Sequence, residues 1–141
     1  MEDTPLIEVS CALILNRGRL LATRRSTDMP HALKWEFPGG KLKPGEPARE
    51  SILREIREEL GIGIRILGTL TPVIHVYPTH RVRLHPFICE PDQGEIYLAE
   101  HQEYRWVEFG ALEALDWLDA DVEVLSLFLE RQGIQERKAR N

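Results

Sequence analysis

The sequence has few cysteines, no long hydrophobic run and no surplus of basic side chains, and each shortage excludes a class of protein. Its two cysteines, Cys11 and Cys89, lie far apart in apolar segments. This excludes a disulfide-stapled scaffold and favours buried free thiols in a reducing compartment. Apolar runs such as residues 11–15 fall far short of the roughly 20 residues that a membrane helix needs. Since the acidic N-terminus does not resemble a secretory signal, we expect a cytoplasmic protein with no membrane partner.

Basic side chains are outnumbered, because 18 Lys and Arg face 23 Asp and Glu and the formal net charge is −5. The acidic excess is concentrated in residues 90–123. A net-acidic chain lacks the broad basic surface that a duplex-DNA binder presents. We therefore expect no duplex nucleic acid as partner, and an anionic ligand would need the help of a metal ion.

The remaining composition is that of a folded globular protein. Hydrophobic residues make up 43% and charged residues 29% of the 141 residues, and this length suits one domain. We expect a single domain over residues 1–141, with a polar tail from about residue 133.

The pattern of apolar residues and turn signals predicts a mixed arrangement of strands and helices. Residues 6–15 and 19–25 read as an antiparallel hairpin. The segment 26–47 carries four prolines and three glycines, which predicts a shaped loop with interrupted regular structure. Further strands are expected in 62–77, 81–89 and 103–109, and helices over 47–60, 110–115 and 121–131. Without a steady βαβ rhythm, this order favours a mixed sheet between helices.

The helix predicted over 47–60 carries an unusual acidic face. Glu55, Glu58 and Glu59 share one arc beside the apolar stripe, although like charges at this spacing repel. One alternative is a solvated surface on which Arg54 and Glu58 form an i,i+4 pair. The other is a cation site, because clustered carboxylates are hard ligands that suit Mg²⁺ or Mn²⁺.

The spacing of residues around this helix resembles the Nudix box. From Gly40 the chain reads five residues, Glu46, seven residues, Arg54-Glu55-Ile56, one residue, Glu58-Glu59, one residue, then Gly61-Ile62. Before the box, residues 34–41 (Lys-Trp-Glu-Phe-Pro-Gly-Gly-Lys) are similar to the entry loop of MutT-type members.

The resemblance implies an α/β/α sandwich around a mixed sheet and metal-dependent hydrolysis of a nucleoside diphosphate linked to a further group. It implies metal ligation by Glu55, Glu58 and Glu59 with a main-chain oxygen at Gly39, and Glu100 resembles a later metal-binding acid. It also implies that Glu55 is the general base and that Arg54 and Glu46 orient the helix face, with Gly40 as structural support. Catalytic roles are therefore expected for Arg54, Glu55, Glu58 and Glu59.

The substrate signals are Arg25, Lys41 and Asp121. The resemblance suggests nucleotide contact by Arg25 and Lys41 and recognition of the base edge by Asp121. Exposed strand-end cations and a helix-capping aspartate are the alternatives.

The resulting hypothesis is a MutT-like, Mg²⁺-dependent enzyme that hydrolyses a (deoxy)nucleoside triphosphate to the monophosphate and pyrophosphate. An oxidised purine such as 8-oxo-dGTP or a cytosine nucleotide would be its substrate, and nucleotide-pool sanitation its task. A pyrophosphatase for nucleotide sugars of the ADP-ribose type and a noncatalytic nucleotide-sensing module remain open as alternatives. The sequence does not determine the oligomeric state.

Overall fold

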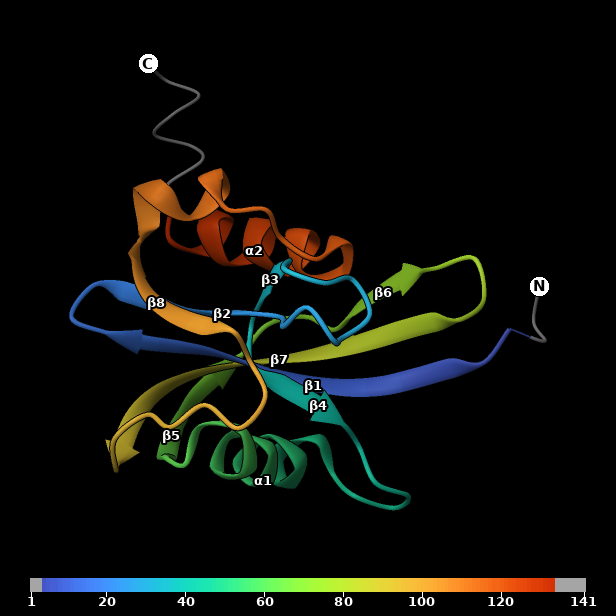
Figure 1. Ribbon diagram of the computed structural model, residues 1–141, viewed down its shortest axis with the longest axis horizontal. Helices are drawn as coiled ribbons and strands as arrows, with labels where there is room; N and C mark the ends of the chain where they lie inside the picture. Colours follow the sequence, from blue (N-terminus) through green and yellow to red (C-terminus); the bar gives the residue numbers. More distant parts are fainter. Residues whose placement is uncertain (1–3, 134–141) are drawn as a thin grey trace.

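Two long parallel strands form the centre of a mixed β-sheet with a helix on each face (Figure 1). The computed structural model describes residues 4–133. Strand β1 (Leu6–Asn16) runs parallel to β7 (Arg81–Gln93), with Leu6 opposite Arg81 and Ile14 opposite Cys89. Strand β2 (Arg19–Arg24) pairs antiparallel with the end of β1, which confirms the predicted hairpin.

The other strands extend this sheet as antiparallel neighbours. The sheet order is β3-β2-β1-β7-β5, while β4 pairs with β1, β6 with β7 and β8 with β2. These strands are β3 (Trp35–Glu36), β4 (Gly39–Lys41), β5 (Gly63–Thr69), β6 (Val73–Val76) and β8 (Glu103–Glu108).

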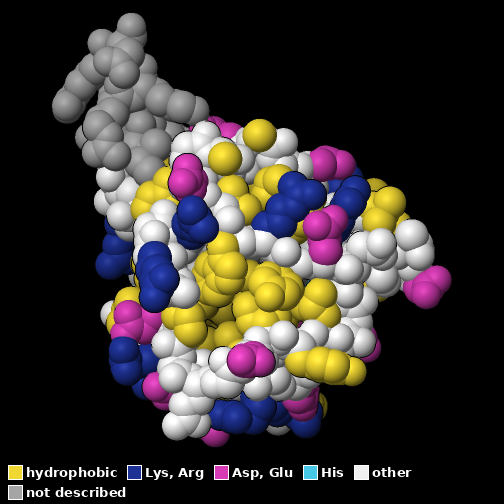
Figure 2. Space-filling model, turned by 60° about the vertical axis from the view of Figure 1, so that its left-hand side comes forward, with side chains coloured by type: hydrophobic (Ala, Val, Ile, Leu, Met, Phe, Trp, Pro, Cys, Tyr) yellow, Lys and Arg dark blue, Asp and Glu magenta, His cyan; other side chains and the backbone are white. Residues whose placement is uncertain are grey.

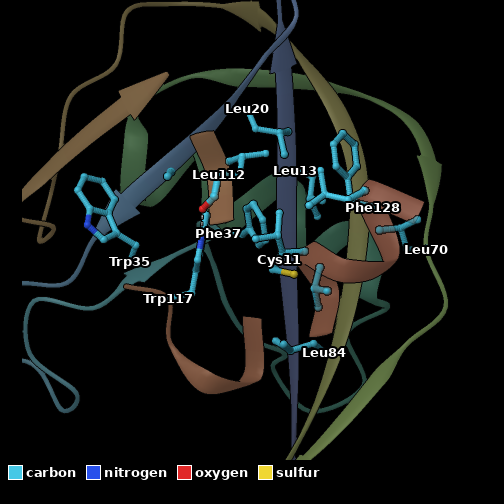
Figure 3. Close-up of a cluster of buried hydrophobic side chains, with 14 of the residues drawn as sticks. Cys11, Leu13, Leu20, Trp35, Phe37, Leu70, Leu84, Leu112, Trp117 and Phe128 are labelled. Atoms are coloured by element: carbon cyan, nitrogen blue, oxygen red, sulfur yellow. Dashed lines mark hydrogen bonds between the residues drawn. The ribbon is translucent and has the colours of Figure 1, made fainter. Parts of the chain in front are cut away.

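Helix α1 (Ala48–Leu60) covers one face of the sheet and α2 (Asp119–Arg131) the other. Alternate residues of β1 point to opposite faces, as a strand requires. Ala12 and Ile14 therefore pack with the apolar stripe of α1, whereas Cys11 and Leu13 join the cluster beneath α2. Figure 3 shows this second cluster, in which Trp117 donates from Nε1 to the carbonyl of Leu112 at 2.7 Å. The α/β/α arrangement around a mixed sheet is confirmed.

Two details of the predicted order are wrong. The proline- and glycine-rich segment contains β3 and β4, because its backbone still pairs with neighbouring strands although its side chains give no strand pattern. The single strand expected in 62–77 is two strands, β5 and β6, which pair with different parts of β7.

The predicted helices lie within two residues of their expected starts. Pro47 is the extended N-cap of α1 rather than its first residue, and Gly61 ends the helix in the left-handed conformation (φ 70°). The short helix expected over 110–115 is a 3₁₀ helix, η1 (Phe109–Ala114). The predicted polar tail falls mostly on residues 134–141, outside the described residues.

Both cysteines are buried free thiols, as predicted. Between residues 4 and 133, no helix is long and apolar enough to cross a membrane. Figure 2 shows one face of the molecule, on which hydrophobic side chains gather in a patch bordered by acidic and basic ones.

Candidate active site

Helix α1 presents its acidic face because its apolar face is fixed against the sheet. Ile52, Ile56 and Leu60 are fully buried, and burying side chains of this size stabilises a fold by about 1.5–3 kcal/mol each. Helical periodicity then places Glu55 and Glu59 at the border of the buried stripe. The packing of the core therefore fixes the rotation of α1 about its axis, and with it the carboxylates that face the loop before the helix.

Arg54 connects three carboxylates on this side of α1. Its Nε and Nη2 donate to the two carboxylate oxygens of Glu46 at 2.8 and 2.9 Å. Its Nη1 donates to Glu55 at 3.0 Å and to Glu58 at 2.9 Å. Hydrogen bonding by Arg54 lowers the pKa of Glu46 to about 2. The resemblance to the Nudix box implies this pairing of Arg54 with Glu46. The i,i+4 pair of Arg54 with Glu58, which was expected for a solvated helix surface, is present as well.

Glu59 is the most perturbed acid of the helix. Its Oε1 accepts a hydrogen bond from the backbone N–H of Gly39 at 3.0 Å. Burial, together with the neighbouring carboxylates of Glu36, Glu55 and Glu100, raises the pKa of Glu59 to about 8. Low dielectric and nearby like charges both disfavour the ionised form. Four carboxyl groups therefore share one electrostatic neighbourhood.

The two glycines before α1 allow the loop to pass close to both β1 and the acids. A Cβ at Gly39 would lie 1.9 Å from the carbonyl oxygen of Ser10, and one at Gly40 would lie 2.3 Å from the carboxylate carbon of Glu55. A side chain at Gly39 would therefore have to displace the backbone of β1, and one at Gly40 would have to displace the carboxylate of Glu55. Beneath the loop, the hydroxyls of Ser10 and Ser51 hydrogen-bond at 2.9 Å and link β1 to α1.

The acids suit a divalent cation chemically, although they are not arranged around one. Among the described residues, no three His, Cys, Asp or Glu side chains converge as a metal-binding group. The reason is visible in the contacts, since Arg54 holds Glu55 and Glu58 while Gly39 holds Glu59. Carboxylates crowded enough to raise the pKa of Glu59 are the hard donors that Mg²⁺ or Mn²⁺ prefers. Glu100 is exposed and contributes through its charge.

A cavity of about 510 Å³ adjoins the acidic face. Glu59, Gly39, Gly40 and Lys41 line it next to α1, and most of its lining surface as a whole is apolar. This volume is in the range of small-molecule sites. The cavity can therefore hold a ligand with an apolar ring system and an anionic end beside the acids.

The three predicted substrate residues all line this cavity. Arg25 is not a free strand-end cation, since its Nη1 donates to Glu36 at 2.8 Å and its side chain is only 16% exposed. Lys41 is exposed. Asp121 is buried in the first turn of α2, where it accepts a hydrogen bond from the N–H of Phe37 at 2.7 Å. The helix-capping alternative is wrong, because Leu118 is the N-cap.

Burial also raises the pKa of Asp121 well above its usual range, and the charge of Glu36 adds to the effect. The side chain can thus offer a proton as well as an acceptor oxygen to a ligand in the cavity.

Sequence reasoning missed several lining residues, among them Glu36, His31, Tyr77 and His80. Glu36 belongs to the entry-loop segment that resembles MutT-type proteins, so its position was a usable signal. The others come from loops and strand ends whose approach depends on the tertiary fold. His31 lies 5.4 Å and His80 5.0 Å from the ring of Tyr77, measured between ring centroids.

Nudix hydrolases have this architecture. It is a mixed sheet between two helices, in which a glycine-containing loop packs against an acidic helix beside a cavity. The solution structure of the Escherichia coli ORF135 protein matches this chain with a TM-score of 0.82 and 29% identity, over 94% of each chain. The NUDIX domain model matches residues 4–128. This chain belongs to the Nudix family.

Two curated relatives from Escherichia coli K12 are similar along nearly their whole length. The CTP pyrophosphohydrolase is 32% identical over 126 residues, which is 88% of this chain and 92% of the relative. The 8-oxo-dGTP diphosphatase is 29% identical over 121 residues, 85% of this chain and 94% of the relative.

Proposed function

We propose that this Nudix hydrolase converts a (deoxy)nucleoside triphosphate to the monophosphate and pyrophosphate with Mg²⁺ or Mn²⁺. The observation that carries the proposal is the meeting of the acidic face of α1 with the cavity at Glu59, Gly39 and Gly40. The proposed substrates are a cytosine nucleotide and an oxidised purine such as 8-oxo-dGTP. The names of the two Escherichia coli relatives support both.

The proposed division of labour follows the positions of the side chains. Lys41, an exposed residue that lines the cavity next to Gly39 and Gly40, would contact the polyphosphate. Asp121, which lines the cavity from the first turn of α2, would hydrogen-bond the edge of the base with Oδ1, since Oδ2 accepts from Phe37. The cavity between them is apolar enough to exclude water from a bound ring. The nucleotide would thus be held at both ends.

Glu55, Glu58 and Glu59, with the main chain at Gly39 and with Glu100, are the groups proposed to hold the cation. When bound, a divalent cation lowers the pKa of water and neutralises charge on phosphate oxygens. Glu55 would accept the proton of the attacking water as general base. Arg54, anchored by Glu46 through two hydrogen bonds, would keep Glu55 oriented.

The alternatives draw less support from the site. A noncatalytic sensing module has no need of the complete set of box acids. Here Glu46, Glu55 and Glu58 bond to Arg54, and Glu59 bonds to the loop at Gly39. No contact among the described residues favours a nucleotide sugar over a triphosphate.

A panel of nucleoside triphosphates, including CTP and 8-oxo-dGTP, tests the proposal. Pyrophosphate release should require Mg²⁺, and Glu58→Gln should lose most of kcat while folding normally. Glu50→Gln is the matched control, because Glu50 lies exposed on the same helix away from the contacts of Arg54. Equal activity of wild type and Glu58→Gln would refute the cation assignment, and no turnover of any triphosphate by the wild type would refute the reaction.

A further inference from the structure

His101 is a buried histidine whose two ring nitrogens have different surroundings. It lies between β7 and β8, and its side chain has no exposed surface. Nε2 lies 2.8 Å from Oε2 of Glu36, whereas Nδ1 is buried without a hydrogen-bond partner in the described part of the chain. An unpaired buried nitrogen costs stability. Packing alone therefore gives no reason for an imidazole here, and the contact with Glu36 does.

Glu36 connects His101 to the wall of the cavity. Its carbonyl oxygen accepts a hydrogen bond from the buried hydroxyl of Thr23 at 3.0 Å, which fixes the backbone. Its carboxylate receives Nη1 of Arg25 on one oxygen and His101 on the other, each at 2.8 Å. The side chain is 14% exposed and lines the cavity. Two donors thus hold this carboxylate in one orientation.

Arg25 continues the chain of contacts into the loop that follows β2. Its Nε donates to the carbonyl of Pro30 at 2.7 Å, and its backbone N–H donates to the carbonyl of Lys34 at 2.9 Å. The loop contributes Met29, Pro30 and His31 to the cavity wall.

The backbone of this loop is strained. His31 and Leu33 have φ values of 55° and 65°, in the left-handed region that residues with a side chain adopt at a cost in energy. Such a conformation persists when surrounding contacts impose it. Arg25 supplies three such contacts across the loop, to Pro30, Leu33 and Lys34. Nε of Arg24, which donates to the carbonyl of Leu33 at 3.0 Å, and the ring of Tyr77 beside His31 add to them.

We infer that His101 is a positioning residue for the ligand cavity: it orients Glu36, Glu36 anchors Arg25, and Arg25 holds residues 26–34 against the cavity. His101 itself does not line the cavity, so it acts through Glu36. Its loss should weaken binding of the ligand more than it slows the chemical step. The identity of the ligand as a nucleotide rests on the proposed function.

Two substitutions of His101 and one matched control test this inference. His101→Leu removes the donor to Glu36. His101→Gln keeps it, because the amide nitrogen of glutamine can lie where Nε2 of the imidazole lies. His85→Leu breaks a similar pair, in which Nε2 of His85 lies 2.7 Å from Glu8, away from the cavity.

The first readout separates KM from kcat with CTP and 8-oxo-dGTP. His101→Leu should raise KM about tenfold or more, as expected when a hydrogen bond to a charged group is lost, with kcat changed less than about threefold. His101→Gln should restore KM to within about threefold, and His85→Leu should match wild type.

The second readout needs no substrate. In the nucleotide-free protein, the amides of Leu33 and Lys34 bond across the loop to Arg25 and His31. Their hydrogen exchange should be about tenfold faster in His101→Leu and unchanged in His101→Gln and His85→Leu. If His101→Leu does not fold, His101→Asn takes its place, because its shorter amide does not reach Glu36.

The inference would be overturned if folded His101→Leu, or His101→Asn in its place, kept the KM and the exchange rates of wild type. It would also be overturned if His101→Gln showed the same raised KM and faster exchange as His101→Leu. Absence of triphosphate turnover by wild type would refute the proposed function, and the exchange data would still decide the role of His101.

Discussion

Replacing Glu59 with glutamine should stabilise the cation-free protein at neutral and alkaline pH. The structure holds this acid in a buried position among other carboxylates, which raises its pKa to about 8 from an ordinary 4.5. Glutamine keeps the acceptor oxygen for the N–H of Gly39 but carries no charge. The substitution therefore removes the electrostatic cost and leaves the hydrogen bond.

The sign and size of the effect follow from proton linkage. Between about pH 4.5 and 8 the folded wild type retains a proton that the unfolded chain releases, so the contribution of Glu59 to stability is present at low pH and is lost as the pH rises. One pKa unit corresponds to about 1.4 kcal/mol, so the free energies of unfolding of the two proteins should diverge by about 3 kcal/mol at pH 7 and about 5 kcal/mol above pH 8.

Urea unfolding in EDTA at several pH values measures this divergence, with Glu50→Gln as the control on the same helix. Groups such as Asp121 titrate in both proteins and cancel in the difference. Parallel stability curves of wild type and Glu59→Gln from pH 4.5 to 8 would refute the reasoning. Addition of Mg²⁺ should narrow the gap by stabilising wild type alone.

The two loop glycines and the cysteines give further expectations. Gly40→Ala should fold, because the added Cβ meets the movable carboxylate of Glu55, but kcat should fall at least tenfold in a pyrophosphate-release assay. Gly39→Ala should instead lower Tm, since its Cβ meets the backbone of Ser10 and displaces β4 from β1; a Tm loss for Gly40→Ala as large as for Gly39→Ala would contradict this distinction. Burial raises the pKa of Cys89 to about 12 and that of Cys11 well above its usual range. A thiol reagent at pH 8 should thus label both after unfolding in urea and neither in the native protein, and fast native labelling would contradict their burial.

Elements whose signals lie within a few residues of one another could be predicted from the sequence. Helix α1 has a proline before it, a glycine after it and a periodic apolar stripe, and all three act within a few residues. The same periodicity placed Glu55, Glu58 and Glu59 on one face. The contact of Arg54 with Glu46 came from the family resemblance, because the two residues are eight apart and meet through a loop.

Features that depend on distant segments could not be predicted in the same way. Strand β4 exists because β1 supplies hydrogen-bond partners, not because Gly39-Gly40-Lys41 favours a strand. The wall of the cavity combines the loop after β2, the turn after β6 and the start of α2. Glu36 and His101 are 65 residues apart and meet only after β3 and the segment before β8 have joined the sheet.

The central claim is that the carboxylates of α1 support the attack of water on a triphosphate held in the adjacent cavity. Phosphorus-31 NMR of the products formed from CTP or 8-oxo-dGTP in the presence of Mg²⁺ tests it most directly. The account predicts pyrophosphate and the nucleoside monophosphate in equal amounts, with neither formed when Glu55, Glu58 and Glu59 are all replaced by glutamine in a folded protein. Release of orthophosphate and a diphosphate, or unchanged turnover by the triple variant, would contradict it.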